Sequence, residues 1–244
     1  MKTIILDKPM WIIGDVHGEY DLLVDLLNQI PEGAPICFVG DLIDRGSNSK
    51  EVIQLIREKG YYCVKGNHED MAVNHLYTLL DKEPQRYNLA DWIKYGGDAT
   101  IYSYIKEKDF ETYYKKTDEI ENDFNWLKNL PTIIKFKIKT GSFFPRYLKP
   151  VYASHSSIQL FRSDEKIDKE NEDSYVMWNR VRQKEVGFAV NIHGHSPIMT
   201  ELSNISKSQI NVDSGVVYSG NPMFGYLTAI EYPTKRRLYS KTKK

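Results

Sequence analysis

The segment GDLIDRG at residues 40–46 places two carboxylates and a guanidinium directly after an apolar run. Asp41 and Asp44 are three residues apart, and Arg45 follows the second acid. The preceding run, at residues 35–39, has the character of a buried strand, whereas these charged side chains pack poorly in a hydrophobic core. Acids and an arginine at the end of a strand are suited to bind a metal ion or an anionic group. The segment is therefore the first candidate for a functional site.

The same arrangement occurs at five other places along the chain, where an apolar run is followed by Asp, Asn or His. In α/β proteins ligands bind at the carboxyl ends of parallel strands, so these strand ends can converge if the strands share one sheet. Gly14, Gly40, Gly66 and Gly194 precede four of the polar clusters, and glycine lets the backbone leave a strand sharply. The other strand-end residues are Asp15 and His17, then Asn67, His68 and Glu69, then His155, then His193 and His195, and finally Asp213.

The chemistry of these side chains points to metal ions. They offer imidazole nitrogens and hard oxygens without a thiolate, and this mixture suits Mn, Fe or Zn better than Mg. The set also contains more ligands than one ion needs, which favours a two-metal site with a bridging carboxylate. Each short motif is weak evidence on its own, whereas the ordered series of motifs is specific.

Strands and helices must alternate to position these residues, and the first 65 residues show that alternation. It predicts parallel strands joined by crossover helices, with the helices near residues 22–30 and 52–56. Residues 69–130 have a mainly helical pattern, and we expect a helical insertion at residues 70–130 within one domain that extends over residues 1–244. The expected strands lie at residues 10–13, 36–39, 61–64, 132–139, 151–153, 188–192, 210–212 and 226–230.

Three segments are expected to lack regular secondary structure, and two histidines are expected not to bind metal. Residues 141–150 are expected to form a loop, the charged run at 164–173 a solvated loop, and the basic segment 235–244 a frayed terminus. His75 is expected to be a packing or surface residue, and His193 a structural residue behind the site.

The composition argues against several classes of partner. Lys and Arg (33) balance Asp and Glu (33), so a bulk electrostatic attraction to nucleic acid or to an anionic membrane is not indicated. The N-terminus lacks the continuous apolar region of a signal peptide, and no apolar run approaches the length of a membrane span. Cys37 and Cys63 lie in apolar runs, so we expect buried, reduced thiols in a cytoplasmic protein that binds neither DNA nor membranes.

Four motifs in this order resemble the calcineurin-like metallophosphoesterases: GDVHG at 14–18, GDLIDRG at 40–46, GNHE at 66–69 and GHSP at 194–197. Within that superfamily the chain is similar to the phosphoprotein phosphatase branch of the bacterial and bacteriophage lambda type. Weaker support comes from YGGDAT, MWNR and NVDSG, and the resemblance extends from about Trp11 to Ile230. It implies an α/β (α+β) fold, namely a β-sandwich of mixed sheets flanked by helices, with a helical insertion.

The resemblance also implies two divalent metal ions, with Mn²⁺ as the expected metal and Fe or Zn as alternatives. Asp15 and His17 would bind the first ion, and Asp41 would bridge the two. The ligands of the second ion would be completed by Asn67, His155 and His195.

Further roles follow from the same resemblance. His68 would be the general acid, paired with Asp44, while Arg45 and Arg180 would hold the phosphate oxygens with help from Asn67. A metal-bridging hydroxide would attack phosphorus directly, so no covalent phospho-enzyme is required. One departure from the family pattern is Ser156-Ser157, which follow His155 where the family usually has glycine or an acid.

Three functions are compatible with these motifs. The leading one is the hydrolysis of phosphoserine and phosphothreonine in proteins by a monomeric enzyme. The alternative is the hydrolysis of dinucleoside polyphosphates or of capped RNA 5′ ends, for which aromatic residues of the insertion and of the 141–150 loop offer stacking surfaces. A non-catalytic scaffold of the same fold is disfavoured, because every matched position holds a chemically competent residue.

Overall fold

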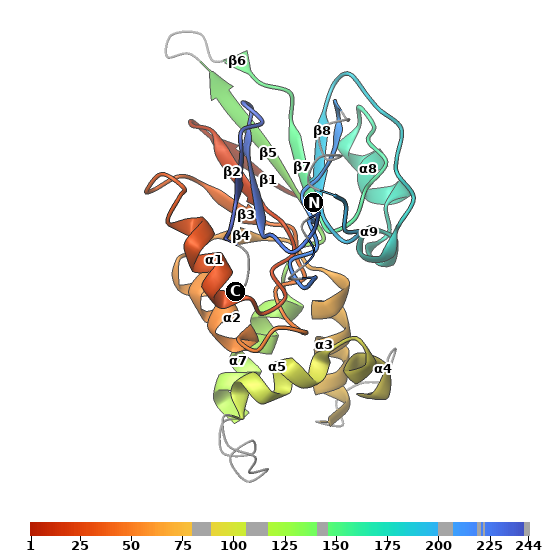
Figure 1. Ribbon diagram of the computed structural model, residues 1–244. Helices are drawn as coiled ribbons and strands as arrows, with labels where there is room; N and C mark the ends of the chain where they lie inside the picture. Colours follow the sequence, from red (N-terminus) through yellow and green to blue (C-terminus); the bar gives the residue numbers. More distant parts are fainter. Residues whose placement is uncertain are drawn as a thin grey trace.

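Two β-sheets pack face to face at the centre of the molecule, and helices cover their outer faces (Figure 1). This arrangement confirms the predicted class, an α/β sandwich of mixed sheets flanked by helices. The computed structural model describes residues 1–79, 89–105, 117–140, 146–199, 207–218, 221 and 223–241.

The first sheet has the strand order β11-β10-β2-β3-β4, in which β2, β3 and β4 are parallel and β10 is antiparallel to both of its neighbours. Side chains alternate across it: Met10 and Ile12 face the core between the sheets, whereas Trp11 and Ile13 face the helices. Because both faces of the sheet are covered, strand β2 is apolar throughout. The strands are β2 (Met10–Ile13), β3 (Ile36–Phe38), β4 (Tyr62–Cys63), β10 (Thr228–Tyr232) and β11 (Arg237–Tyr239).

The second sheet has the strand order β1-β5-β7-β8-β9, and β6 pairs with β5 beside this path. Strands β7, β8 and β9 are parallel, whereas β5 runs antiparallel to β7 and parallel to β1. Phe136 and Ile192 are fully buried between the sheets. The strands are β1 (Lys2–Leu6), β5 (Ile133–Thr140), β6 (Arg146–Tyr147), β7 (Val151–Ser154), β8 (Val190–His193) and β9 (Gln209–Asn211).

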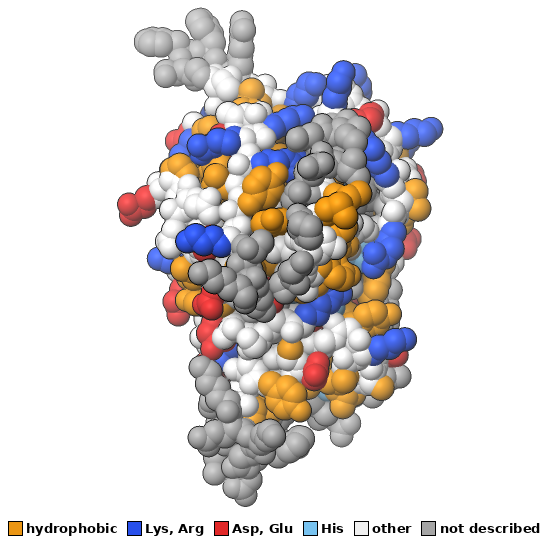
Figure 2. All heavy atoms as spheres, in the orientation of Figure 1, with side chains coloured by type: hydrophobic (Ala, Val, Ile, Leu, Met, Phe, Trp, Pro, Cys, Tyr) orange, Lys and Arg blue, Asp and Glu red, His pale blue; other side chains and the backbone are white. Residues whose placement is uncertain are grey.

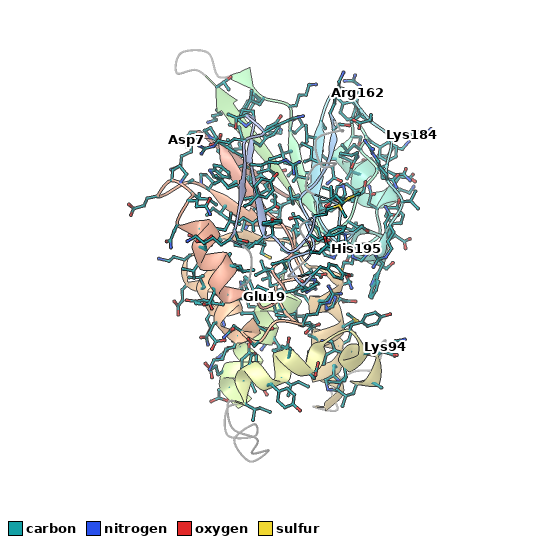
Figure 3. The ribbon with its side chains drawn as sticks, in the orientation of Figure 1. Asp7, Glu19, Lys94, Arg162, Lys184 and His195 are labelled. Atoms are coloured by element: carbon teal, nitrogen blue, oxygen red, sulfur yellow. The ribbon has the colours of Figure 1, made fainter. Side chains whose placement is uncertain are left out.

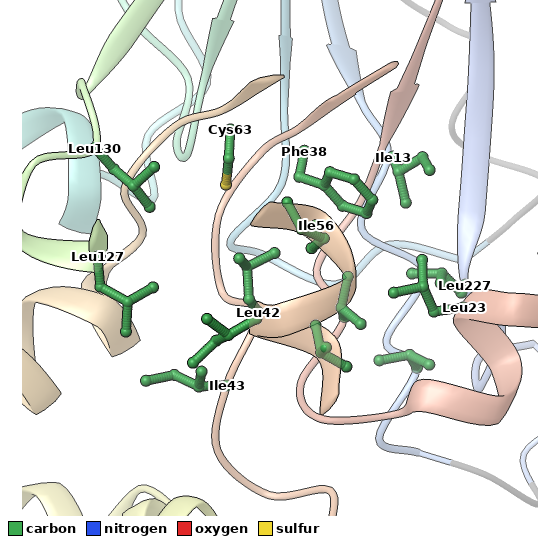
Figure 4. Packing of buried hydrophobic residues seen from close by; sticks show 14 of the residues in the cluster. Ile13, Leu23, Phe38, Leu42, Ile43, Ile56, Cys63, Leu127, Leu130 and Leu227 are labelled. Atoms are coloured by element: carbon green, nitrogen blue, oxygen red, sulfur yellow. The ribbon is translucent and has the colours of Figure 1, made fainter. Parts of the chain in front are cut away.

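A second hydrophobic core lies between the first sheet and the helices. Figure 4 shows Leu23, Ile56 and Leu127 of α1, α2 and α7 around Phe38 and Ile13 of the sheet. Together with the core between the sheets, this packing fixes β2 and β3 from both sides. The helices of this part are α1 (Tyr20–Leu27), α2 (Ser49–Glu58), α3 (Asn67–Leu79), α4 (Leu89–Lys94), α5 (Gly97–Tyr104) and α7 (Thr117–Lys128).

Helices α8 (Asp164–Glu170) and α9 (Asp173–Trp178) cover the outer face of the second sheet, where the charged run was expected to be a solvated loop. That expectation is wrong for two local reasons. The Ser163 hydroxyl accepts a hydrogen bond from the Lys166 backbone N–H and caps α8. Ile167 is fully buried against the sheet, so the helix has an apolar side despite its many charges.

Two other segments differ from the prediction. The tail is not frayed at residues 237–241, because β11 pairs with β10 and the Ser240 side chain accepts a hydrogen bond from the Leu227 backbone N–H. In the expected 141–150 loop, Arg146 and Tyr147 form β6, while residues 141–145 lie outside the described part of the chain. Strand β1 was not expected, since apolar and polar side chains do not clearly alternate along its five residues.

The surface facing the viewer in Figure 2 carries charged side chains of both signs with hydrophobic ones between them. None of the helices in the described part of the chain is long and apolar enough to cross a bilayer.

The parallel strands of both sheets end at the same edge of the sandwich, above helices α3, α4 and α5 (Figure 1). The six strand ends therefore converge although their strands do not share one sheet: β2, β3 and β4 belong to the first sheet, and β7, β8 and β9 to the second. The sandwich thus brings together two sets of three loops that a single sheet would have placed in one row.

Candidate metal and phosphate site

A small cleft lies where the six strand ends meet, and most of the predicted site residues line it. Figure 3 marks His195 at this edge of the sandwich, above the helices. Asp44 and His155 are fully buried and contact residues of the lining rather than forming it. The lining consists of Asp15, His17, Asp41, Arg45, Asn67, His68, Arg180, His195, Pro197, Asp213, Gly215, Val217 and Tyr218.

Asp41 lies at the centre of two groups of side chains that can each hold a metal ion. One group is His17, Asp41 and His68, and the other is Asp41, His155 and His195, with the ligand atoms of each group within 4.8 Å of one another. The two carboxylate oxygens of Asp41 face different histidines. Oδ1 lies 3.3 Å from His155 Nε2, whereas Oδ2 lies 3.7 Å from His17 Nε2 and 3.8 Å from His68 Nε2. Asp41 is therefore placed to bridge two cations.

Two histidines are oriented by backbone carbonyls. His17 Nδ1 lies 2.9 Å from the carbonyl of Ile43, and His155 Nδ1 lies 2.9 Å from the carbonyl of Val39. A carbonyl only accepts hydrogen bonds, so Nδ1 carries a proton in both rings and Nε2 faces the other candidate ligands. Fixing the tautomer in this way is the usual arrangement around metal-binding histidines.

The surroundings of His155 Nε2 fit a cation. This nitrogen faces Asn67 Oδ1 at 2.9 Å and His195 Nδ1 at 3.0 Å, and Asp41 Oδ1 is close by. Burial lowers the pKa of His155, but the charge and hydrogen bond of Asp41 outweigh burial and raise it to about 10. Burial and the His155 charge lower the pKa of His195 to about 3. The raised pKa of His155 means that positive charge is favoured at this position, and a divalent metal ion would supply it in place of the proton on Nε2.

Several buried carboxylates lie close enough to repel one another when ionised. Burial and the Asp213 charge raise the pKa of Asp15 well above its usual range, and burial raises that of Asp213 to about 6. For Asp41 the penalty of burial is outweighed by the surrounding histidine charges, which hold its pKa well below the usual range. Carboxylates that cannot ionise together without added positive charge are a further sign of a site built for cations.

The backbone at the cleft is strained in a consistent way. His17, Asp41, Asp44, Arg45 and His195 all have positive φ angles, between 47° and 72°, a region that side chains other than glycine rarely adopt. The loops hold each other in this form, because the N–H groups of residues 16 and 17 both donate to the Asp41 carbonyl at 2.9 Å. Such strain persists only where the surrounding structure fixes it.

Close packing at two strand exits requires glycine. A Cβ atom at Gly194 would lie 2.0 Å from Asp15 Oδ1, and one at Gly66 would lie 2.2 Å from Asp41 Oδ1. Any side chain at these positions would displace a carboxylate of the site. The sequence prediction that glycine lets the backbone approach the site closely is therefore consistent with the observed geometry.

Glu69 ties two strand exits together and was not assigned a role from the sequence. Its carboxylate is fully buried and accepts three backbone hydrogen bonds of 2.8 Å, from the N–H groups of Asp41, Leu42 and Gly66. Burial and the Asp41 charge raise the pKa of Glu69 to about 7, although each of these backbone partners is a donor and favours the ionised form. The carboxylate thereby fixes the loops that follow β3 and β4 against each other.

His68 differs from His17 and His155 in its Nδ1 partner, which is a carboxylate. His68 Nδ1 lies 2.6 Å from Asp44 Oδ2, and its Nε2 faces Arg45 at 3.0 Å. The same guanidinium lies 2.7 Å from His17 Nε2. Arg180 follows α9 and lines the mouth of the cleft with an exposed side chain.

The two serines after His155 point away from the cleft. Ser156 donates to the Val176 carbonyl at 2.6 Å, and Ser157 donates to Gln209 Oε1 at 3.0 Å. Both hydroxyls join the strand-end loop to the second sheet and α9, and neither serine lines the cleft.

The two histidines that were not expected to bind metal both lie outside the cleft lining. His193 is buried beside the site but does not line the cleft, and His75 is buried against the Trp92 ring. The sequence analysis missed Pro197, Val217 and Tyr218 as lining residues. A signal was present, because Pro197 ends the GHSP motif and Val217 and Tyr218 lie two and three residues after NVDSG.

Comparisons with known proteins agree with this geometry. A family model described as calcineurin-like phosphoesterase matches residues 8–199. Serine/threonine-protein phosphatase 2 of Escherichia coli K12 is 43% identical over 74 residues, which cover 29% of this chain and 34% of that protein. The chain thus matches about a third of the length of this curated relative.

Two solved structures share the fold. A putative diadenosine tetraphosphatase has a TM-score of 0.62 at 19% identity, with 99% of this chain and 98% of that chain covered. A protein serine/threonine phosphatase from Saccharomyces cerevisiae has a TM-score of 0.56 at 15% identity, with 100% and 84% covered. At these identities the two structures support only the similarity of the fold.

Glu69→Gln is expected to lower the free energy of unfolding by about 1–3 kcal/mol, because the amide group must turn its own N–H toward at least one backbone donor. Urea unfolding measures the effect. The exposed Glu58→Gln removes one charge elsewhere and is the matched control, with a change within about 0.5 kcal/mol. Equal stability of Glu69→Gln and Glu58→Gln would contradict the role of Glu69 in joining the loops.

Proposed function

This chain belongs to the calcineurin-like phosphoesterase family, and from that premise we propose that it removes phosphate from phosphoserine and phosphothreonine of proteins with the help of two divalent metal ions. Family membership makes the chain a phosphoesterase hydrolase; the substrate, the residue roles and the metal are proposals. The observation that carries them is the position of Asp41, which two groups of possible metal-binding side chains share. His68 belongs to one of these groups and is also paired with Asp44, which sets it apart as the acid.

We assign the ligands from the family pattern, and the structure places all of them in or directly behind the cleft lining. Asp15, His17 and Asp41 would hold one ion, and Asp41, Asn67, His155 and His195 would hold the second. When bound, the ions polarise the phosphate and lower the pKa of a coordinated water, which makes it a nucleophile near neutral pH. Nitrogen and oxygen ligands without a thiolate favour Mn²⁺, with Fe or Zn as alternatives.

His68 is the proton donor in this proposal. Its Nδ1–H is held by the Asp44 carboxylate rather than by a carbonyl, and a carboxylate stabilises the imidazolium form. Nε2 faces the cleft and reaches the oxygen of the leaving group. A histidine in this setting protonates the alkoxide of serine or threonine, which is a poor leaving group without a proton.

Arg45 and Arg180 hold the phosphate. The Arg45 guanidinium lies beside His17 and His68 and donates to both rings, so a phosphate that takes over these donors also frees His68 Nε2 to carry its proton. Arg180 is exposed at the mouth of the cleft and reaches the phosphate from there. Planar guanidinium groups suit the charge that is spread over phosphate oxygens.

Proteins are the favoured substrates because the matched curated relative is a serine/threonine-protein phosphatase. A dinucleoside polyphosphate is the second candidate, since a solved structure of the same fold is described as a putative diadenosine tetraphosphatase. Exposed aromatic side chains support this alternative: Tyr218 lines the cleft and Tyr95 lies 6.5 Å from the His68 ring, and base stacking uses such surfaces.

Metal dependence is the first test of the proposal. We expect the purified protein to hydrolyse p-nitrophenyl phosphate in the presence of Mn²⁺, to lose this activity after treatment with a chelator, and to regain it when Mn²⁺ is added back. Release of p-nitrophenolate measures the rate. Turnover that persists after complete removal of metal would contradict the proposed chemistry.

Substrate choice is tested by kcat/KM for a phosphoserine peptide and for diadenosine tetraphosphate, measured side by side in the same Mn²⁺ buffer. We expect the peptide to be preferred. The matched variant Tyr218→Ala removes an exposed ring of the cleft wall and is expected to reduce nucleotide hydrolysis more than peptide hydrolysis. A large preference of the unaltered protein for the nucleotide would reverse the ranking of the two substrates.

A further inference from the structure

The carboxylate of Asp44 has two further hydrogen-bond partners, and both come from the helical insertion. Trp92 of α4 donates its indole Nε1–H to Asp44 Oδ2 at 2.9 Å, and Thr100 of α5 donates its hydroxyl to Oδ1 at 2.6 Å. Asp44 and Thr100 are fully buried, and Trp92 is almost so. With His68, the carboxylate therefore accepts hydrogen bonds from three side chains.

Helix α5 and the residue before it also hold the backbone of the Asp44–Arg45 turn. The Thr100 hydroxyl accepts a hydrogen bond from the Asp44 N–H at 2.9 Å, and the Gly96 carbonyl accepts one from the Arg45 N–H at 3.0 Å. Asp44 and Arg45 have φ angles of 72° and 70°, a conformation that needs support from outside the turn. The contacts from α5 and from the residue before it supply that support.

The segment between the two donors is shaped to fit this turn. A Cβ atom at Gly97 would lie 2.5 Å from the Trp92 ring. At Gly96 the φ angle is 97°, and a Cβ atom would lie 2.9 Å from the Arg45 nitrogen. On its other side the Trp92 ring packs against His75, with 5.2 Å between ring centroids. The sequence YGGDAT, which gave only weak support for the family resemblance, is thus the part of the insertion that contacts the catalytic turn.

We infer that Trp92 and Thr100 are positioning residues for proton donation, because they hold the Asp44 carboxylate in the one orientation that presents Oδ2 to His68 Nδ1. Each carboxylate oxygen has a donor from the insertion, so the carboxylate plane cannot rotate without breaking a buried, charge-assisted hydrogen bond. Without these donors Asp44 is free to turn away from His68. The inference rests on the proposed function, in which His68 gives the proton to the leaving group.

Two substrates with different leaving groups separate this role from a merely structural one. The leaving group of a phosphoserine peptide is the serine alkoxide, which needs the proton from His68. The leaving group of 2,4-dinitrophenyl phosphate is a stable phenolate, which does not need a proton. Loss of proton donation therefore lowers kcat for the peptide and spares the aryl ester. Loss of folded protein, bound metal or phosphate binding lowers both rates together.

The experiment measures kcat and KM for both substrates with Thr100→Val, Thr100→Ser and Trp92→Phe. Thr100→Val keeps the shape of the side chain but removes the hydroxyl, while Thr100→Ser keeps the hydroxyl and tests rescue. Trp126→Phe is the control, since this half-buried tryptophan of α7 packs against the same core away from Asp44. His68→Asn gives the reference loss of rate when the proton donor itself is removed. Metal content and thermal unfolding are measured for every variant.

We expect Thr100→Val and Trp92→Phe each to lower kcat for the phosphoserine peptide by about 10- to 100-fold, the range for loss of a hydrogen bond to a charged group, with KM nearly unchanged. The rate for 2,4-dinitrophenyl phosphate is expected to fall less than about threefold. Thr100→Ser should recover most of the loss, and Trp126→Phe should leave the ratio of the two rates unchanged.

Equal losses on the two substrates in Thr100→Val and Trp92→Phe would overturn the inference and leave a structural role for both residues. If His68→Asn itself lowers the two rates equally, the assignment of the acid in the proposed function has failed, and the inference falls with it. The two failures are thus told apart by the His68→Asn reference.

Discussion

The shared carboxylate of Asp41 is the constraint on which the rest of the site depends. Its oxygens face His155 on one side and His17 and His68 on the other, so both groups of candidate ligands exist only while this side chain stays in place. The backbone of Asp41 is held as firmly as its side chain. Its N–H donates to Glu69, and its carbonyl accepts from the loop that follows β2. Three strand exits of the first sheet are thereby joined at one residue.

The second sheet completes the site across the sandwich. Strands β7, β8 and β9 deliver His155, His195 and Asp213 to the cleft from the opposite side, and the core between the sheets fixes the distance between the two sets of loops. The helical insertion adds a third support from below, through Trp92 and Thr100 at Asp44. The sheets thus set the position of the candidate metal ligands, and helices α4 and α5 set the orientation of the His68–Asp44 pair.

Much of this arrangement was predictable from the sequence because chemistry and periodicity coincide at the strand ends. The apolar runs before Asp15, Asp41 and His195 are buried on both faces, which makes them continuous and easy to recognise. The division of the strands between two sheets was not predictable, since parallel pairing within β2–β4 and β7–β9 leaves no local trace of which sheet a strand joins. Glu69 and Thr100 were missed as supports for a similar reason, because their partners are backbone groups and side chains distant in the sequence. The α8 helix was missed because a charged surface hid the single buried Ile167.

The most direct test of the account is the number of metal ions that the chain binds. Titration of the metal-free protein with Mn²⁺, followed by calorimetry and by elemental analysis after dialysis, gives this number for the unaltered chain and for Asp41→Asn, which keeps the size of the side chain but lacks its charge. The account predicts two ions per unaltered chain and fewer than two in Asp41→Asn, with weaker binding of whatever remains. One ion or none in the unaltered chain, or two ions bound with undiminished affinity by Asp41→Asn, would contradict the claim that this carboxylate bridges a two-metal site.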